Sequence, residues 1–105
     1  EIQTACAAAD SLGLCIFGRS VTNVSAELIV TALNDAHGAN LDPSFLQTLG
    51  REALRMEWEF NKAAGFTEKD DELPEFFYKE ALAPSGKTAR HHSAEVNRSL
   101  RELLA

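Results

Sequence analysis

The chain has 105 residues, of which 45% are hydrophobic and 25% are charged, and these values are typical of a globular protein rather than a disordered tail or a fibre. Ten Lys and Arg residues against 16 Asp and Glu residues give a net charge of −6, which argues against a nucleic-acid partner because binding a phosphate backbone needs a basic face. No apolar run approaches the roughly 20 residues of a membrane helix, and no signal peptide is visible, so we expect a cytoplasmic protein with no membrane partner.

The chain opens at Glu1 without an initiator Met, and we therefore expect a piece of a longer polypeptide. Its length suits one domain, residues 1–105.

The first two predicted helices have clear boundaries. Alanine, the best helix former, dominates residues 2–10, and Gly13 is the predicted stop. The second helix is predicted to begin after Ser25, a favourable N-cap, and to end at His37 and Gly38. Its apolar positions fall on one helical face and comprise Leu28, Ile29, Ala32, Leu33 and Ala36.

The third predicted helix, residues 43–64, carries the strongest pattern. Asp42 is its expected N-cap, Pro43 its first residue and Gly65 its terminator. We expect Gly50 to be a weak point inside it, costing about 1 kcal/mol against alanine. The apolar stripe at spacings of three and four comprises Phe45, Leu46, Leu49, Ala53, Met56, Phe60 and Ala64.

An acidic loop, residues 67–74, follows, and we expect it to be solvated surface. As an alternative, Asp70 and Asp71 would cap a short helix that opens near Pro74 or would bind a cation.

The remaining segments predict a turn at 83–86 and a last helix from Ser93, with His91 and His92 in a solvated loop between them. No alternating strand pattern of useful length occurs. The predicted fold class is therefore all-α, with about four to five helices.

The segment 10–15 groups residue types that can carry chemistry. Asp10 can accept hydrogen bonds from an N–H-rich heterocycle, Gly13 allows close approach to the backbone, and the Cys15 thiolate can ligate a soft metal. Cys6 and Cys15 are too few to form a metal centre alone. The alternative is a helix C-cap followed by a buried cysteine.

The motif Asp-x-x-Gly-Leu-Cys at residues 10–15 resembles the C-terminal cofactor motif of the aldehyde ferredoxin oxidoreductase family. A second block resembles that family in the same order and comprises Gly50-Arg51-Glu52, Glu59-Phe60-Asn61, Gly65-Phe66-Thr67, Asp70-Asp71 and Leu73-Pro74-Glu75. The chain departs from the family by lacking an Arg at 62–64 and by having Phe76 where an Arg is common, which leaves the substrate class open.

The resemblance implies the C-terminal helical part of an enzyme that binds tungsten or molybdenum through pterin (molybdopterin) groups beside a [4Fe–4S] cluster. Such an enzyme oxidises an aldehyde to a carboxylic acid and passes electrons to ferredoxin or a similar carrier. By the same resemblance, Cys15 is the fourth cluster ligand, Asp10 and the backbone near Leu14 contact the pterin, and Gly13 gives clearance. The other three ligands would come from a Cys-x-x-Cys-x-x-x-Cys run, which these residues lack.

The implied partners are the pterin-binding and cluster-binding parts of the same polypeptide, with a homodimer also open. We expect these 105 residues alone to bind no cofactor and to be inactive. An apolar surface that the missing parts would cover is expected at 5–9, Leu12, Leu14, Ile16 and Phe17. The alternative function is a stand-alone, non-enzymatic helical interaction module.

Overall fold

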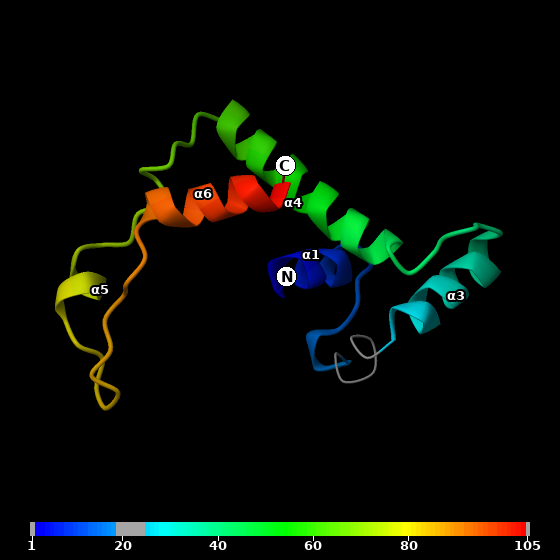
Figure 1. The fold of residues 1–105 in the computed structure, drawn as a ribbon, viewed down its shortest axis with the longest axis horizontal. Helices are drawn as coiled ribbons and strands as arrows, with labels where there is room; N and C mark the ends of the chain where they lie inside the picture. Colours follow the sequence, from blue (N-terminus) through cyan, green and yellow to red (C-terminus); the bar gives the residue numbers. More distant parts are fainter. Residues whose placement is uncertain (1, 19–24, 105) are drawn as a thin grey trace. The chain divides into compact units, whose positions relative to one another are not determined.

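The architecture is all-α, as predicted. A computed structural model describes residues 2–18 and 25–104. The elements in chain order are α1 (Ile2–Ser11), the 3₁₀ turn η1 (Ile16–Gly18), α3 (Ala26–His37), α4 (Phe45–Ala63), α5 (Phe76–Lys79) and α6 (Ser93–Leu104) (Figure 1). The described residues contain no strand beyond an isolated bridge between Leu82 and Lys87.

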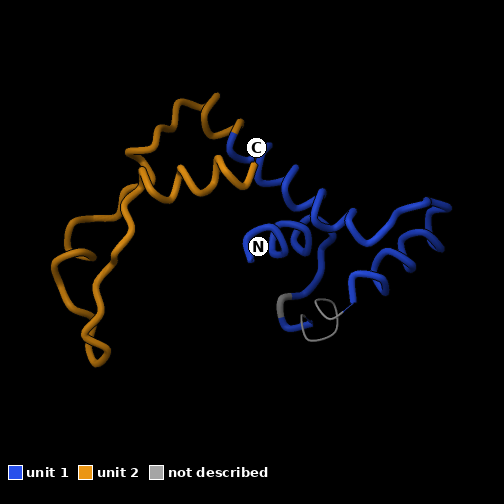
Figure 2. Tube along the Cα trace, viewed as in Figure 1, with its two compact units in different colours: residues 1–58 blue, residues 59–105 orange. Residues whose placement is uncertain are grey.

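The chain divides into two compact units, residues 1–58 and 59–105, and each is described by itself (Figure 2). No helix in the described ranges combines the length and the apolar character that crossing a membrane requires.

The end of α1 is set by Gly13, which confirms the predicted stop. Gly13 has a φ of 67°, in the left-handed region. The Leu14 N–H donates to the Ala9 carbonyl at 2.8 Å and the Gly13 N–H donates to the Asp10 carbonyl at 3.0 Å. This pair of bonds is a Schellman motif, which satisfies carbonyl groups that the helix end would otherwise leave unpaired.

α4 ends in the same way at Gly65, which has a φ of 94°. The Phe66 N–H donates to the Asn61 carbonyl at 3.0 Å and the Gly65 N–H donates to the Lys62 carbonyl at 3.1 Å. A Cβ atom added at Gly13 or Gly65 would meet nothing within 4 Å. The left-handed backbone, and not lack of space, is therefore what requires glycine at both positions.

The predicted limits of α3 are confirmed, but its buried side differs from the expected face. The Ser25 hydroxyl oxygen accepts from the Leu28 N–H at 3.2 Å, and Gly38 closes the helix with a φ of 62°. Val30, which the periodicity did not select, is buried with 4% of its surface exposed, whereas Leu28 is 54% exposed. Apolar residues are spread too widely around α3 for the sequence pattern to predict which side of the helix is buried.

α4 begins at Phe45, two residues later than predicted. The Asp42 carboxylate accepts from the Ser44 N–H at 2.8 Å. Hydrogen bonding with the Ser44 side chain and, to a smaller extent, with this N–H lowers the Asp42 carboxyl pKa. The Phe45 N–H donates to the Asp42 carbonyl at 3.0 Å, a three-residue turn rather than an α-helical turn. Asp42 thus organises the entry to the helix, while regular α-helix starts after it.

Gly50 is where α1 and α4 cross, and the sequence analysis did not predict this packing role. A Cβ atom at Gly50 would lie 2.9 Å from the carbonyl carbon of Thr4 and closer still to the carbonyl oxygen. Thr4 and Ala8 on α1 are buried, with 5% and 4% of their surfaces exposed. Only glycine lets the two backbones approach this closely, so the residue supports packing in unit 1.

The acidic loop in unit 2 is exposed surface, as expected, and its own carboxylates also give it structure. Asp70 accepts from the Thr67 N–H at 2.6 Å and from the Thr67 hydroxyl at 2.8 Å, which lowers the Asp70 pKa. Asp71 accepts from the Asn97 side-chain amide at 3.0 Å. The capping alternative was therefore wrong, because α5 has Glu75 at its N-cap position with no side-chain cap hydrogen bond.

Candidate functional site

The segment 10–15 lies at the exit of α1 in unit 1. Asp10 is an exposed residue of the last helical turn, Gly13 forms the left-handed turn, and Leu14 is half-buried beyond it. Cys15 is exposed and immediately precedes η1. The alternative of a helix C-cap followed by a buried cysteine is right about the cap at Gly13 and wrong about burial, because Cys15 is exposed.

Part of the apolar surface expected near Cys15 in the sequence is exposed. Phe17 is 93% exposed, while Leu12 and Leu14 are half-buried. Within the alanine-rich segment 5–9, Ala8 is buried. The side chain of Ile16 lies outside the described residues. The exposed apolar side of this segment is thus centred on Phe17, two residues after the candidate ligand.

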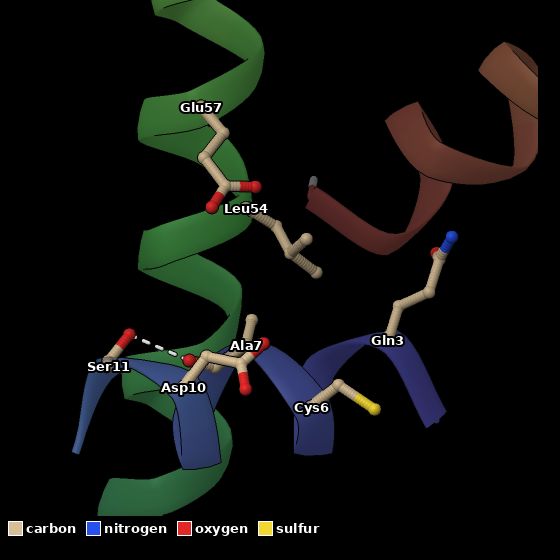
Figure 3. A pocket seen from close by; sticks show the side chains of 7 residues that line it. All are labelled: Gln3, Cys6, Ala7, Asp10, Ser11, Leu54 and Glu57. Atoms are coloured by element: carbon tan, nitrogen blue, oxygen red, sulfur yellow. Dashed lines mark hydrogen bonds between the residues drawn. The ribbon is translucent and has the colours of Figure 1, made fainter. Parts of the chain in front are cut away.

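An open groove of about 480 Å³ runs between α1 and α4 within unit 1 (Figure 3). Asp10 and Ser11 lie at one end of it and Gln3 at the other, while Leu54 and Glu57 project from α4. Cys6 and Ala7 complete the lining, which does not include Cys15.

The polar lining of the groove has a distinct chemical character. It contains two carboxylates and an amide but no Lys, Arg or His, so it offers mainly hydrogen-bond acceptors to a ligand. The Ser11 hydroxyl is already committed, because it donates to the Ala7 carbonyl at 2.7 Å. Sequence analysis selected Asp10 but missed Gln3, Leu54 and Glu57, because only the helix crossing brings them together.

The two cysteines occupy different environments. Cys6 is half-buried within α1 and lines the groove, whereas Cys15 is exposed, and neither forms a disulfide. Within residues 2–18 and 25–104, no group of three or more His, Cys, Asp or Glu side chains is arranged to hold a metal ion.

A second polar cluster, in unit 2, was missed by the sequence analysis. Glu72 accepts a hydrogen bond from the Tyr78 hydroxyl and another from the Ser93 N–H at 3.0 Å, and its carboxylate lies 2.9 Å from His92 Nδ1. The Tyr78 and His92 rings stack with their centroids 4.3 Å apart. The Tyr78 hydroxyl has the largest effect and, with Ser93 and His92, lowers the Glu72 pKa to about 2.

Tyr78→Phe is expected to raise the Glu72 pKa from about 2 toward its ordinary value of 4.5 while preserving the ring stack. Because the folded-state pKa is depressed, Glu72 stabilises the fold fully above pH 4.5, and this stabilisation is lost as the pH falls toward about 2. Titration of the Glu72 carboxyl carbon by NMR measures the shift. An identical titration in the variant and the parent would contradict the role of Tyr78.

Comparison with known proteins identifies the family. The family model described as aldehyde ferredoxin oxidoreductase, domains 2 & 3, matches residues 1–105. Searches of curated proteins and of solved structures gave no significant match. The match covers the whole chain and confirms the family resemblance. The chain therefore belongs to the aldehyde ferredoxin oxidoreductase family of oxidoreductases, within the region that forms domains 2 and 3.

Proposed function

We propose that this chain closes the cofactor site of an aldehyde-oxidising tungsten or molybdenum enzyme, with Cys15 as one ligand of a [4Fe–4S] cluster. The observation that carries the proposal is the exposure of Cys15 directly after the Gly13 turn. Iron–sulfur clusters are held by cysteine thiolates. A cysteine that binds a cluster held mainly by another part of the polypeptide must be exposed on the surface of its own part. Cys6, half-buried in α1, is less suited to this role.

The groove supports a contact between Asp10 and a pterin. A pterin ring carries several N–H donors, and the groove presents the carboxylates of Asp10 and Glu57 with no competing cation in its lining. Asp10 lies at the same end of α1 as the turn that leads to Cys15. In this proposal Asp10 and the backbone near Leu14 orient the pterin.

Gly13 serves these contacts through its backbone conformation. Its φ of 67° turns the chain from Asp10 toward Cys15, and the space beyond its Cα is open, which gives a bulky group clearance. When bound, the metal–pterin group supplies oxidation of an aldehyde to a carboxylic acid, and the cluster supplies single-electron transfer to ferredoxin or a similar carrier. The residues of this chain position those groups, and none of them is assigned as a catalytic acid or base.

The partners of this proposal are the pterin-binding and cluster-binding parts of the same polypeptide, in a cytoplasmic enzyme. The exposed side chain of Phe17, beside Cys15, is apolar surface that such a part would cover. A homodimer is compatible with the same surface.

The test compares the full-length protein with residues 1–105 alone. The full-length protein should contain iron, pterin and tungsten or molybdenum, and should oxidise an aldehyde with viologen as electron acceptor. Residues 1–105 alone should fold as a helical protein without this activity, because they supply one cluster ligand and part of one cofactor wall. A full-length protein that contains no iron and no pterin would overturn the proposal and favour a helical interaction module.

A further inference from the structure

The acidic loop runs along one face of α6 in unit 2. Each contact joins a carboxylate of the loop to a different turn of the helix. The contacts are Glu72 with the Ser93 N–H at 3.0 Å, Asp71 with the Asn97 amide at 3.0 Å, and an ion pair between Glu68 and Arg101. Ser93, Asn97 and Arg101 are four residues apart, which places them on neighbouring turns of one side of α6.

The first of these contacts supports the start of the helix. Ser93 is the first residue of α6, so its N–H is one of the groups that the helix cannot pair internally. The Glu72 carboxylate accepts from it and also brings negative charge to the positive end of the helix dipole. Glu72 therefore contributes a capping contact from 21 residues earlier in the chain.

Apolar burial contributes little to unit 2. Asn97, with 5% of its surface exposed, is the one buried residue in the described part of this unit. Its side-chain amide donates to Asp71 and to the Ser93 carbonyl, each at 3.0 Å. Most of the large apolar side chains of the unit are exposed, whereas Leu100, Leu103 and Leu104 on α6 are half-buried. The exposed ones are Phe60, Phe66, Leu73, Phe76, Phe77, Leu82 and Val96.

Two other carboxylates near α6, Glu95 and Asp70, make their contacts elsewhere. Glu95 pairs with His91 at 2.9 Å, and this contact lowers the Glu95 pKa. Asp70 is held by Thr67 within the loop itself. The loop carboxylates that bind α6 are thus those of Glu68, Asp71 and Glu72.

We propose that the acidic loop is a strap that holds α6 through these polar contacts, so that removing the three carboxylates releases α6 while the helices of unit 1 stay folded. Polar contacts of this kind are lost together with the groups that make them, whereas apolar packing would persist. In this proposal, the attachment of α6 depends on the three carboxylates of the acidic loop. The inference does not depend on the cofactor role of Cys15.

Hydrogen exchange of the full-length protein at neutral pH tests the strap. The variant Glu68→Ala/Asp71→Ala/Glu72→Ala should exchange its α6 amides at least about tenfold faster, since it loses several hydrogen bonds to charged groups. The amides of α1 and α3 should keep the exchange rates of the parent protein.

The matched control also replaces three carboxylates of unit 2, but ones outside the strap: Glu75→Ala/Glu80→Ala/Glu102→Ala. It should leave exchange in α6 within about twofold of the parent, because exposed pairs such as Glu75 with Lys79 contribute little. Equal acceleration in both variants, or unchanged α6 exchange in the strap variant, would overturn the proposal. Loss of protection in α1 and α3 as well would overturn it too, since the contacts would then serve the whole fold.

Discussion

Cys15→Ser is expected to remove or destabilise the [4Fe–4S] cluster of the full-length protein, whereas Cys6→Ser should leave it intact. An iron ligand here must be a thiolate, and serine offers a harder oxygen donor that suits the cluster less well. The two cysteines are close in the sequence but differ in exposure. Cys15 is exposed after the Gly13 turn, whereas Cys6 is half-buried in α1. Iron content and electron paramagnetic resonance of the reduced protein measure the difference.

Asp10→Ala provides the comparison within the same motif. It should lower the pterin and the tungsten or molybdenum content with less direct effect on the cluster signal, because Asp10 lines the groove and Cys15 does not. An unchanged cluster in Cys15→Ser, or equal loss in the two cysteine variants, would show that the ligand role belongs to another residue.

Gly50→Ala should lower the free energy of unfolding by about 2 kcal/mol. Helix propensity alone would favour alanine by about 1 kcal/mol, but overpacking typically costs about 1–3 kcal/mol and at times more. The added Cβ would lie 2.9 Å from the Thr4 carbonyl carbon and closer to its oxygen, and a backbone group cannot rotate away as a side chain can. The clash term therefore exceeds the propensity term. Urea denaturation of residues 1–105, followed by circular dichroism, measures the change.

Gly18→Ala is the matched control for this substitution. A Cβ atom at Gly18 would meet nothing within 4 Å, and its φ is not positive, so a change of less than about 0.5 kcal/mol is expected. Stabilisation of the protein by Gly50→Ala would mean that α1 and α4 do not approach at Gly50 as closely as the structure describes.

Helix limits were predictable because they depend on a few neighbouring residues. Ser25 caps α3 through a bond to a residue three positions away, and Gly13, Gly38 and Gly65 close helices by backbone bonds within one or two turns. Such contacts can be recognised in the sequence because only certain residue types can make them.

The packing of the helices was not predictable in the same way. From the sequence alone, Gly50 is a residue of low helix propensity. Its packing role becomes evident only in the structure, where the Thr4 backbone lies against it. The contact of Glu72 with Ser93 joins residues 21 positions apart, and that of Glu68 with Arg101 joins residues 33 positions apart. No local spacing rule links such pairs, so the exposure of the acidic loop was predictable but its contacts with α6 were not. In the candidate site, Asp10 and Cys15 could be selected from one short motif, whereas the groove required two helices.

The shared ending of α1 and α4 bears on how this chain could change in evolution. Gly13 and Gly65 are each required by a left-handed backbone that would persist whether or not a cofactor is bound. A descendant that served only as a scaffold would still be selected to keep both glycines, while the exposed thiol of Cys15 would be susceptible to oxidation. In such a lineage, the two glycines would be retained for the fold, whereas retention of the cysteine would indicate a protein that still works as a redox enzyme.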